Sequence, residues 1–167
     1  MKLKTLPLCD APQYLSQVAK WYQANWGEIY PDRDIKTWEE YLSLNRDKLP
    51  ITFIAVDVTD SNDESVVGTA SLHIRPSILA ELKNEVWLIG VYTNPKDRGK
   101  GVASELLKKC IQFSETHTLE MKPITEIMLL TYTSSKLYQK LGWENIGEFD
   151  VKGEKAMLMT RKIDSVL

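Results

Sequence analysis

The sequence contains little cysteine, little net charge and no long apolar run. Its 167 residues include two cysteines, Cys9 and Cys110, which are too few for a disulfide framework and too far apart for paired zinc ligands, so we expect buried, reduced thiols. A formal net charge of -2 leaves no surplus of Lys and Arg for a phosphate backbone, which argues against nucleic-acid binding. No segment approaches the roughly 20 apolar residues of a membrane span, and the first residues lack an apolar signal core. These absences predict a cytoplasmic protein that does not enter a membrane.

What is present is the composition of an ordinary globular protein. Hydrophobic residues make up 43% of the chain and charged residues 26%, which excludes the disordered and fibrous classes. There is no internal repeat, low-complexity tract or linker rich in Pro, Gly and Ser. A chain of 167 residues supports one proper core more readily than two. We therefore expect a single domain over residues 1–167, acting as a monomer or a homodimer.

The first part of the chain predicts a strand followed by two helices. Residues 2–8 can form the strand, and Asp10 is placed to cap a helix with Pro12 in its first turn. Asp34 is placed to cap a second helix, which Pro50 closes. Apolar side chains recur at helical spacing in both segments: Leu15, Val18, Ala19 and Tyr22, then Ile35, Trp38, Tyr41 and Leu42.

The rest of the chain predicts most of a sheet. Strand-forming residues dominate the segments 51–58, 66–74, 85–93, 126–131, 143–149 and 156–162. Helices are expected at 102–113 and 134–141. A strand, helix, strand order in the middle requires a parallel crossover, whereas the hairpins around it require antiparallel pairs. The predicted class is α+β, with a mixed, mostly antiparallel sheet of about seven strands and about four flanking helices.

One short segment between a predicted strand and a predicted helix has the features of an anion site. Its glycines let the backbone turn tightly and bring N–H groups close to an anion, and the helix that follows directs its positive dipole end there. A solvated turn explains the same six residues equally well. Lys100 is followed by glycine, so the segment is not the GxxxxGK[ST] phosphate loop. The segment comprises Arg98, Gly99, Lys100, Gly101, Val102 and Ala103.

This segment and its surroundings resemble the GNAT superfamily of N-acetyltransferases. The pyrophosphate motif of that family, Arg/Gln-x-x-Gly-x-Gly/Ala, is matched by Arg98, Gly101 and Ala103, and Pro95 stands three residues before the Arg, as in the family. Downstream, Tyr138 opens the stretch YQKLGW, which is similar to the family's YxxxGF-like sequence. The resemblance covers roughly residues 51 to 162 and extends more loosely over the two N-terminal helices.

The resemblance implies how an acyl donor binds and reacts. Acetyl-CoA would lie where the fourth and fifth strands splay apart, with its pyrophosphate on the backbone N–H groups of residues 99–103 and without a metal. Backbone groups of Val91, Tyr92 and Thr93 would pair with the pantetheine arm and polarise the thioester carbonyl. Tyr138 would give a proton to the departing thiolate. From the local sequence alone, Tyr138 is better explained as a half-buried aromatic on a helix.

The residue that would deprotonate the acceptor amine stays open. In some family members this base is a Glu eleven residues before the motif's Arg, and Trp87 stands there in this chain. Glu85 precedes it by two residues and projects from the same face of a strand, so it is a candidate, although a solvated carboxylate at a strand start is an alternative. His73 on the preceding strand is another candidate. An ordered water is the third.

Aromatic and acidic residues alternate in the N-terminal helices and the loop between them. We expect the acceptor to bind at the N-terminal helices, the loop between them and the loop at 76–84. Trp26 and Tyr30 are the best candidates for a pocket wall. Aromatic faces beside carboxylates suit a cationic amine, although most of these rings can equally be core and the acids a solvated face. The aromatics are Trp21, Tyr22, Trp26, Tyr30, Trp38 and Tyr41, and the acids are Glu28, Asp32, Asp34, Glu39 and Glu40.

The function expected from the sequence is transfer of an acetyl group from acetyl-CoA to a primary amine of a small molecule or peptide. A non-catalytic acyl-CoA-binding or regulatory domain on the same fold is the main alternative, because Trp87 stands where some members have Glu. A nucleotide-binding protein of another fold is a third, and it would bind ATP or NAD but not CoA.

Overall fold

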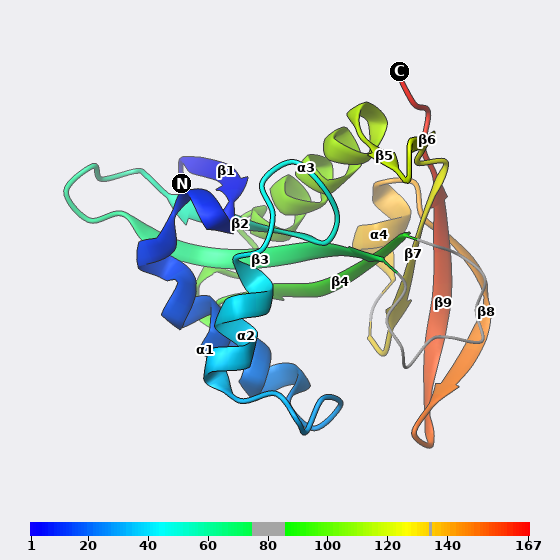
Figure 1. Cartoon of the computed structure of the whole chain (residues 1–167), viewed down its shortest axis with the longest axis horizontal. Helices are drawn as coiled ribbons and strands as arrows, with labels where there is room; N and C mark the ends of the chain where they lie inside the picture. The colour runs from blue at the N-terminus through cyan, green and yellow to red at the C-terminus, as the bar shows by residue number, and fades with distance from the viewer. Residues whose placement is uncertain (75–85, 134) are drawn as a thin grey trace.

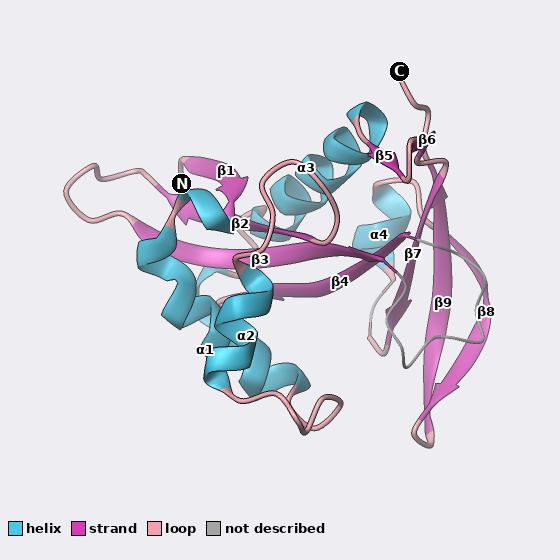
Figure 2. Cartoon of the chain, in the orientation of Figure 1, coloured by secondary structure: helices cyan, strands magenta, loops and turns pink. Residues whose placement is uncertain are grey.

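A computed structural model of the chain describes residues 1–74, 86–133 and 135–167, and these form a mixed α+β structure around one large sheet. The sheet has seven strands, as the sequence predicts, and their order is β1-β2-β3-β4-β7-β9-β8. Figures 1 and 2 show it as a long, twisted layer. Its strands are β1 (Leu3–Pro7), β2 (Ile51–Asp57), β3 (Ser65–Ile74), β4 (Val86–Thr93), β7 (Glu126–Thr131), β8 (Glu144–Val151) and β9 (Glu154–Lys162). The helices are α1 (Leu15–Trp26), α2 (Ile35–Leu42), α3 (Val102–Thr116) and α4 (Lys136–Lys140).

Helices cover both faces of the sheet, and strand β2 shows why. Successive side chains of a strand point to opposite faces. Phe53 and Ala55 therefore pack with residues of α3, whereas Ile54 and Val56 pack with residues of α1 and α2. Figure 1 shows α1 and α2 on one side of β2, β3 and β4, and α3 on the other.

Strands β4 and β7 form the parallel pair, and they separate after one point of contact. Trp87 of β4 pairs with Met128 of β7, whereas β4 continues to pair with β3 as far as Thr93. The pairing of β3 with β4 shifts where Gly90 and Val91 together lie opposite a single residue, Ala70, which is a β-bulge. The bulge reverses the alternation of β4, so that Leu88 and Val91 pack on the α3 side of the sheet and Tyr92 packs on the side of α1 and α2.

The start of the first helix differs from the expectation. Asp10 does not cap α1, because the chain first makes two 3-10 turns, at Leu8–Asp10 and Pro12–Tyr14. The Asp10 carboxylate instead pairs with Arg46, at 2.5 Å. Asp34 does cap α2 as predicted, with its carboxylate accepting the backbone N–H of Thr37 at 2.8 Å.

One further feature, a short hairpin, lies outside the predicted elements. The chain forms a small hairpin of two-residue strands, β5 (Thr118–Leu119) and β6 (Lys122–Pro123), between α3 and β7. The fifth strand of the sequence prediction is therefore β7. Both cysteines are free thiols, and Cys110 is buried as expected, whereas Cys9 is partly exposed. No helix in the described parts of the chain has the length and apolar character needed to span a membrane.

Candidate active site

The N-terminus of α3 is an open turn of backbone N–H groups. Gly101 is the N-cap of α3 with φ of 83°, and it offers no side chain to accept the first N–H groups of the helix. Gly99 has φ of 75°, and at both glycines the space that a Cβ would occupy has no described atom within 4 Å. Such a left-handed backbone favours glycine. Unpaired N–H groups and the positive end of the helix dipole therefore face open space.

The two basic side chains of this turn have different roles. The Lys100 ammonium lies 3.3 Å from the carboxylate of Asp97, which is 5% exposed and also accepts from Asn94 Nδ2 at 3.1 Å. Arg98 donates through Nε to the carbonyl of Thr93 at 3.3 Å, which ties the turn to the end of β4. The charge of Lys100 is thus partly offset, and the helix terminus and Arg98 supply most of the attraction for an anion.

The bulge in β4 is held by a buried chain of hydroxyl groups. Gly90 has φ of 64°, and a Cβ there would lie 2.1 Å from the Tyr22 hydroxyl. The Tyr22 hydroxyl lies 2.5 Å from Ser71 Oγ, and Ser71 Oγ lies 2.7 Å from Thr52 Oγ1. The Tyr22 hydroxyl also donates to the Gly90 carbonyl at 3.5 Å. Burial raises the pKa of Tyr22 to about 12, so this phenol stays protonated and serves as a structural hydrogen-bond partner.

Beyond Trp87, the edge of β4 that faces β7 pairs with no other strand in the described part of the chain. The predicted residues Val91, Tyr92 and Thr93 lie on this edge, with Val91 in the bulge and the other two directly after it. Their neighbour on the other side is β3, where Tyr92 pairs with Thr69 and Thr93 with Gly68. The outward-facing backbone groups of this edge are therefore available to an extended ligand that enters between β4 and β7.

Tyr138 lies on α4, partly buried against the core on the α3 side of the sheet. Its ring meets that of Trp143 edge to face, with 6.2 Å between centroids. Burial raises the pKa of Tyr138 above its ordinary 10.0. Gly142 follows α4 with φ of 96°, where the preceding carbonyl of Leu141 accepts from Arg161 Nε at 2.6 Å. The family-like stretch YQKLGW thus folds as a short helix, a glycine turn and a buried tryptophan, with a protonated phenol near its start.

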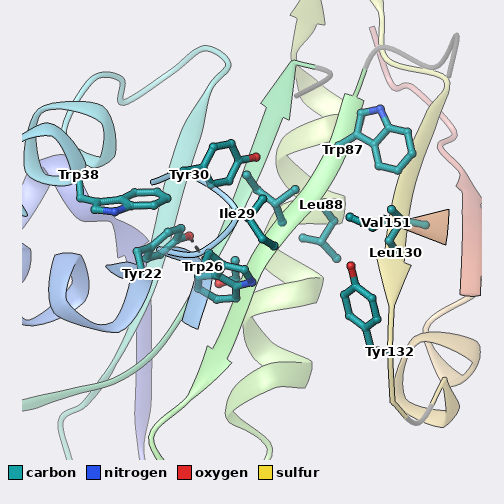
Figure 3. A pocket seen from close by; sticks show the side chains of 12 residues that line it. Tyr22, Trp26, Ile29, Tyr30, Trp38, Trp87, Leu88, Leu130, Tyr132 and Val151 are labelled. Carbon is teal, nitrogen blue, oxygen red and sulfur yellow. Dashed lines mark hydrogen bonds between the residues drawn. The ribbon is translucent and has the colours of Figure 1, made fainter. Parts of the chain in front are cut away.

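An apolar cavity of about 130 Å³ opens on the α1 and α2 side of the sheet, where β4 leaves β7. Figure 3 shows Trp26 and Tyr30 on one side of β4, and Leu130, Tyr132 and Val151 across the cavity on the other. The predicted wall residues Trp26 and Tyr30 line it, and so does Trp87. The full lining is Tyr22, Trp26, Ile29, Tyr30, Trp38, Trp87, Leu88, Ile89, Gly90, Leu130, Tyr132 and Val151.

The candidate bases are placed differently from one another. His73 is absent from the described lining of the cavity; its ring stacks on Tyr41 with 5.4 Å between centroids. Burial lowers the pKa of His73, and the nearby Arg33 guanidinium lowers it further. Trp87 is fully buried beside Met128. Glu85 and the whole predicted loop at 76–84 lie outside the described residues.

Gly90, Tyr22 and Tyr132 contribute to this region in ways that the sequence did not indicate. Gly90 interrupts an apolar strand, which is a signal for a bulge. Tyr22 falls on the apolar face of α1, so nothing local separates it from ordinary core. Tyr132 follows β7 in a loop and enters the cavity wall only because β7 ends there.

Comparison with known proteins identifies the family. Residues 15–143 match the model of the acetyltransferase (GNAT) family. The spermine/spermidine N(1)-acetyltransferase of Bacillus subtilis strain 168 is 32% identical over 98 residues, which are 56% of this chain and 62% of that protein, so the match spans less than two thirds of the relative.

Solved structures share the fold at low sequence identity. Arabidopsis thaliana NAA60 in complex with acetyl-CoA superimposes with a TM-score of 0.67 at 15% identity, covering 98% of this chain and 100% of that one. An aminoglycoside 6'-N-acetyltransferase complexed with coenzyme A gives 0.66 at 15% identity, covering 97% of each chain. Because the family model matches residues 15–143, which are most of this chain, the chain belongs to the GNAT family of acetyltransferases.

Proposed function

We propose that this protein binds acetyl-CoA and transfers its acetyl group directly to a primary amine of a small molecule or peptide. The observation that carries the proposal is the uncapped N-terminus of α3, which lies next to the unpaired edge of β4. A pyrophosphate needs donors and positive potential, and an extended pantetheine arm needs a free strand edge. Both features belong to one continuous stretch of chain, residues 91–103.

The donor would bind along that stretch in a fixed order. The pyrophosphate accepts the N–H groups of residues 99–103, and the arm runs along Val91 to Thr93 toward the bulge at Gly90. The thioester then reaches the end of the cavity, because Gly90 is one of its lining residues. The acceptor amine enters from the cavity side, so donor and acceptor meet at the splay of β4 and β7.

The reaction needs two proton transfers. The amine nitrogen forms a bond to the thioester carbon, and the bond from that carbon to sulfur breaks. The amine proton passes to a base, for which ordered water, Glu85 and His73 are the candidates, and Tyr138 protonates the CoA thiolate. A pKa raised by burial keeps Tyr138 in its acid form at neutral pH, which suits that role.

A non-catalytic acyl-CoA-binding domain is the second candidate function. It is favoured by the fully buried Trp87 in the place of a family Glu, and by the lack of a carboxylate among the described residues that line the cavity. Such a domain would bind acetyl-CoA at the same turn and release no free thiol with any amine. Polyamines, which the name of the Bacillus subtilis relative specifies for that protein, belong in the amine panel that separates the two functions.

The test is a thiol-release assay with acetyl-CoA and an amine panel, on wild type, Tyr138→Phe and Glu85→Gln, beside a direct acetyl-CoA titration. The proposal expects saturable binding of acetyl-CoA and amine-dependent thiol release that Tyr138→Phe reduces. Binding without thiol release would select the non-catalytic function. Absence of acetyl-CoA binding would refute both.

A further inference from the structure

The acceptor cavity has the size and lining of a site for a small apolar group. Its volume is about 130 Å³, and an apolar cavity of about 150 Å³ in another protein is known to hold a benzene molecule. Twelve residues line it, and none of these described side chains carries a formal charge. Six of them are Tyr or Trp residues, whose rings Figure 3 shows around the space near β4: Tyr22, Trp26, Tyr30, Trp38, Trp87 and Tyr132.

A cation already occupies the faces of the neighbouring rings. The Arg33 guanidinium lies 4.2 Å from the ring centroid of Tyr30, 4.7 Å from that of Trp38 and 4.9 Å from that of Tyr41. Two of these rings, Tyr30 and Trp38, line the cavity. Their attraction for a cation is thus taken up by the protein itself.

The charge of Arg33 is not neutralised by an ion pair with any described residue. Its positive potential reaches the sheet, because it lowers the pKa of His73. A second cation brought into the cavity would be repelled by Arg33 and would lose its water without gaining a carboxylate.

The acidic residues of the N-terminal helices and the loop between them do not offset the positive charge of Arg33 at the cavity. None of them belongs to the described cavity lining, and Asp34 spends its carboxylate on capping α2. The sequence pattern of rings beside carboxylates therefore does not produce an acceptor site for a polycation. The acids concerned are Glu28, Asp32, Asp34, Glu39 and Glu40.

We infer that the acceptor is a monoamine whose body is apolar and about the size of a benzene ring, and that Arg33 excludes amines with a second positive charge. The inference rests on the proposed function, because it assigns this cavity to the acceptor. The reacting amine sits at the Gly90 end, where it loses its own charge before attack. The body of the acceptor fills the space between Trp26 and Leu130.

A matched pair of amines tests the inference. Hexylamine and 1,5-diaminopentane have the same number of non-hydrogen atoms and differ by a terminal methyl group against an ammonium. Burial of one methyl group alone is worth roughly fourfold in binding, and the desolvated ammonium adds to the difference. We expect kcat/KM for hexylamine to exceed that for the diamine by more than about tenfold, with 2-phenylethylamine at least as good as hexylamine.

Variants at Arg33 test the cause. Arg33→Gln should narrow the ratio between the two amines and Arg33→Glu should narrow it further, mainly through a lower KM for the diamine. Arg46→Gln is the control, because Arg46 is an exposed arginine that pairs with Asp10 and lies outside the cavity. It should leave the ratio unchanged.

The same two amines are also titrated into the protein by calorimetry, so the inference does not depend on turnover. The inference is supported if hexylamine binds more tightly than the diamine and Arg33→Glu reduces this preference. That result would support it even if no thiol is released, in which case the proposed function alone would fail. The inference would be overturned if the diamine bound as tightly as hexylamine or more tightly, or if Arg33→Glu left the ratio of the two dissociation constants unchanged. Efficient acetylation of the diamine would overturn it while leaving the proposed function in place.

Discussion

The close contact between Gly90 and Tyr22 makes a sharp prediction about the bulge in β4. Replacing Gly90 by Ala forces a side chain into a left-handed backbone with φ of 64°, which costs about 1–2 kcal/mol. It also places a Cβ 2.1 Å from the Tyr22 hydroxyl, and overpacking of this kind costs about 1–3 kcal/mol. Tyr22 is 1% exposed and cannot retreat to solvent. We therefore expect Gly90→Ala to lower the free energy of unfolding by about 2–5 kcal/mol.

Gly153 provides the matched control. It has φ of 87° in the hairpin between β8 and β9, and the space around it is open, so Gly153→Ala should cost only the backbone term of about 1–2 kcal/mol. Urea unfolding of both variants measures the difference, which we expect to shift the midpoint by about 1 M at an ordinary slope. If Gly90→Ala is no less stable than Gly153→Ala, Tyr22 does not hold the bulge as described.

Two further predictions concern single side chains. Tyr138→Phe should lower kcat by about 100-fold or more and leave the dissociation constant for acetyl-CoA unchanged. Because burial raises the pKa of Tyr138 above 10.0, the wild-type phenol should stay protonated, and the rate should not fall through its ionisation, until the pH exceeds 10.0. An equal kcat in the variant would exclude Tyr138 as the acid. Hydrogen bonds from the backbone N–H and the hydroxyl of Thr37 lower the pKa of Asp34 below its ordinary 3.8, so its stabilising effect is present above that pH and is lost as the pH falls through the lowered value. Asp34→Ala should accordingly lower the thermal midpoint at neutral pH and differ less from wild type in strong acid; a difference that grows on acidification would contradict this cap.

The sequence predicted the elements that depend on local pattern. Strands β2, β3, β4 and β7 have apolar or β-branched runs, and α3 has a regular apolar stripe after its glycine turn. Trp26 and Tyr30 could be placed in a pocket wall because Gly27 and Pro31 mark a loop there. In contrast, β5 and β6 have only two residues each, which is too short for any periodic signal.

The features that the sequence did not show depend on contacts between distant segments. The Tyr22 hydroxyl meets the Gly90 carbonyl across 68 positions of chain, and no local pattern in α1 indicates that partner. The ammonium of Lys100 lies 3.3 Å from the carboxylate of Asp97, whose burial depends on the tertiary fold, so the sequence did not show this ion pair. Arg33 similarly reaches rings of α2 rather than an acid of its own loop.

The central claim is that the glycine turn before α3 binds the pyrophosphate of acetyl-CoA, and calorimetric titration of acetyl-CoA into two valine variants tests it most directly. Gly101 and Gly153 have φ of 83° and 87° with open space around both, so valine imposes a comparable backbone strain at each. If the turn binds the pyrophosphate, Gly101→Val should raise the dissociation constant by about tenfold or more through lost hydrogen bonds to the charged phosphates, and Gly153→Val should leave it unchanged. Equal affinities in the two variants, or no binding by the wild type, would contradict the claim.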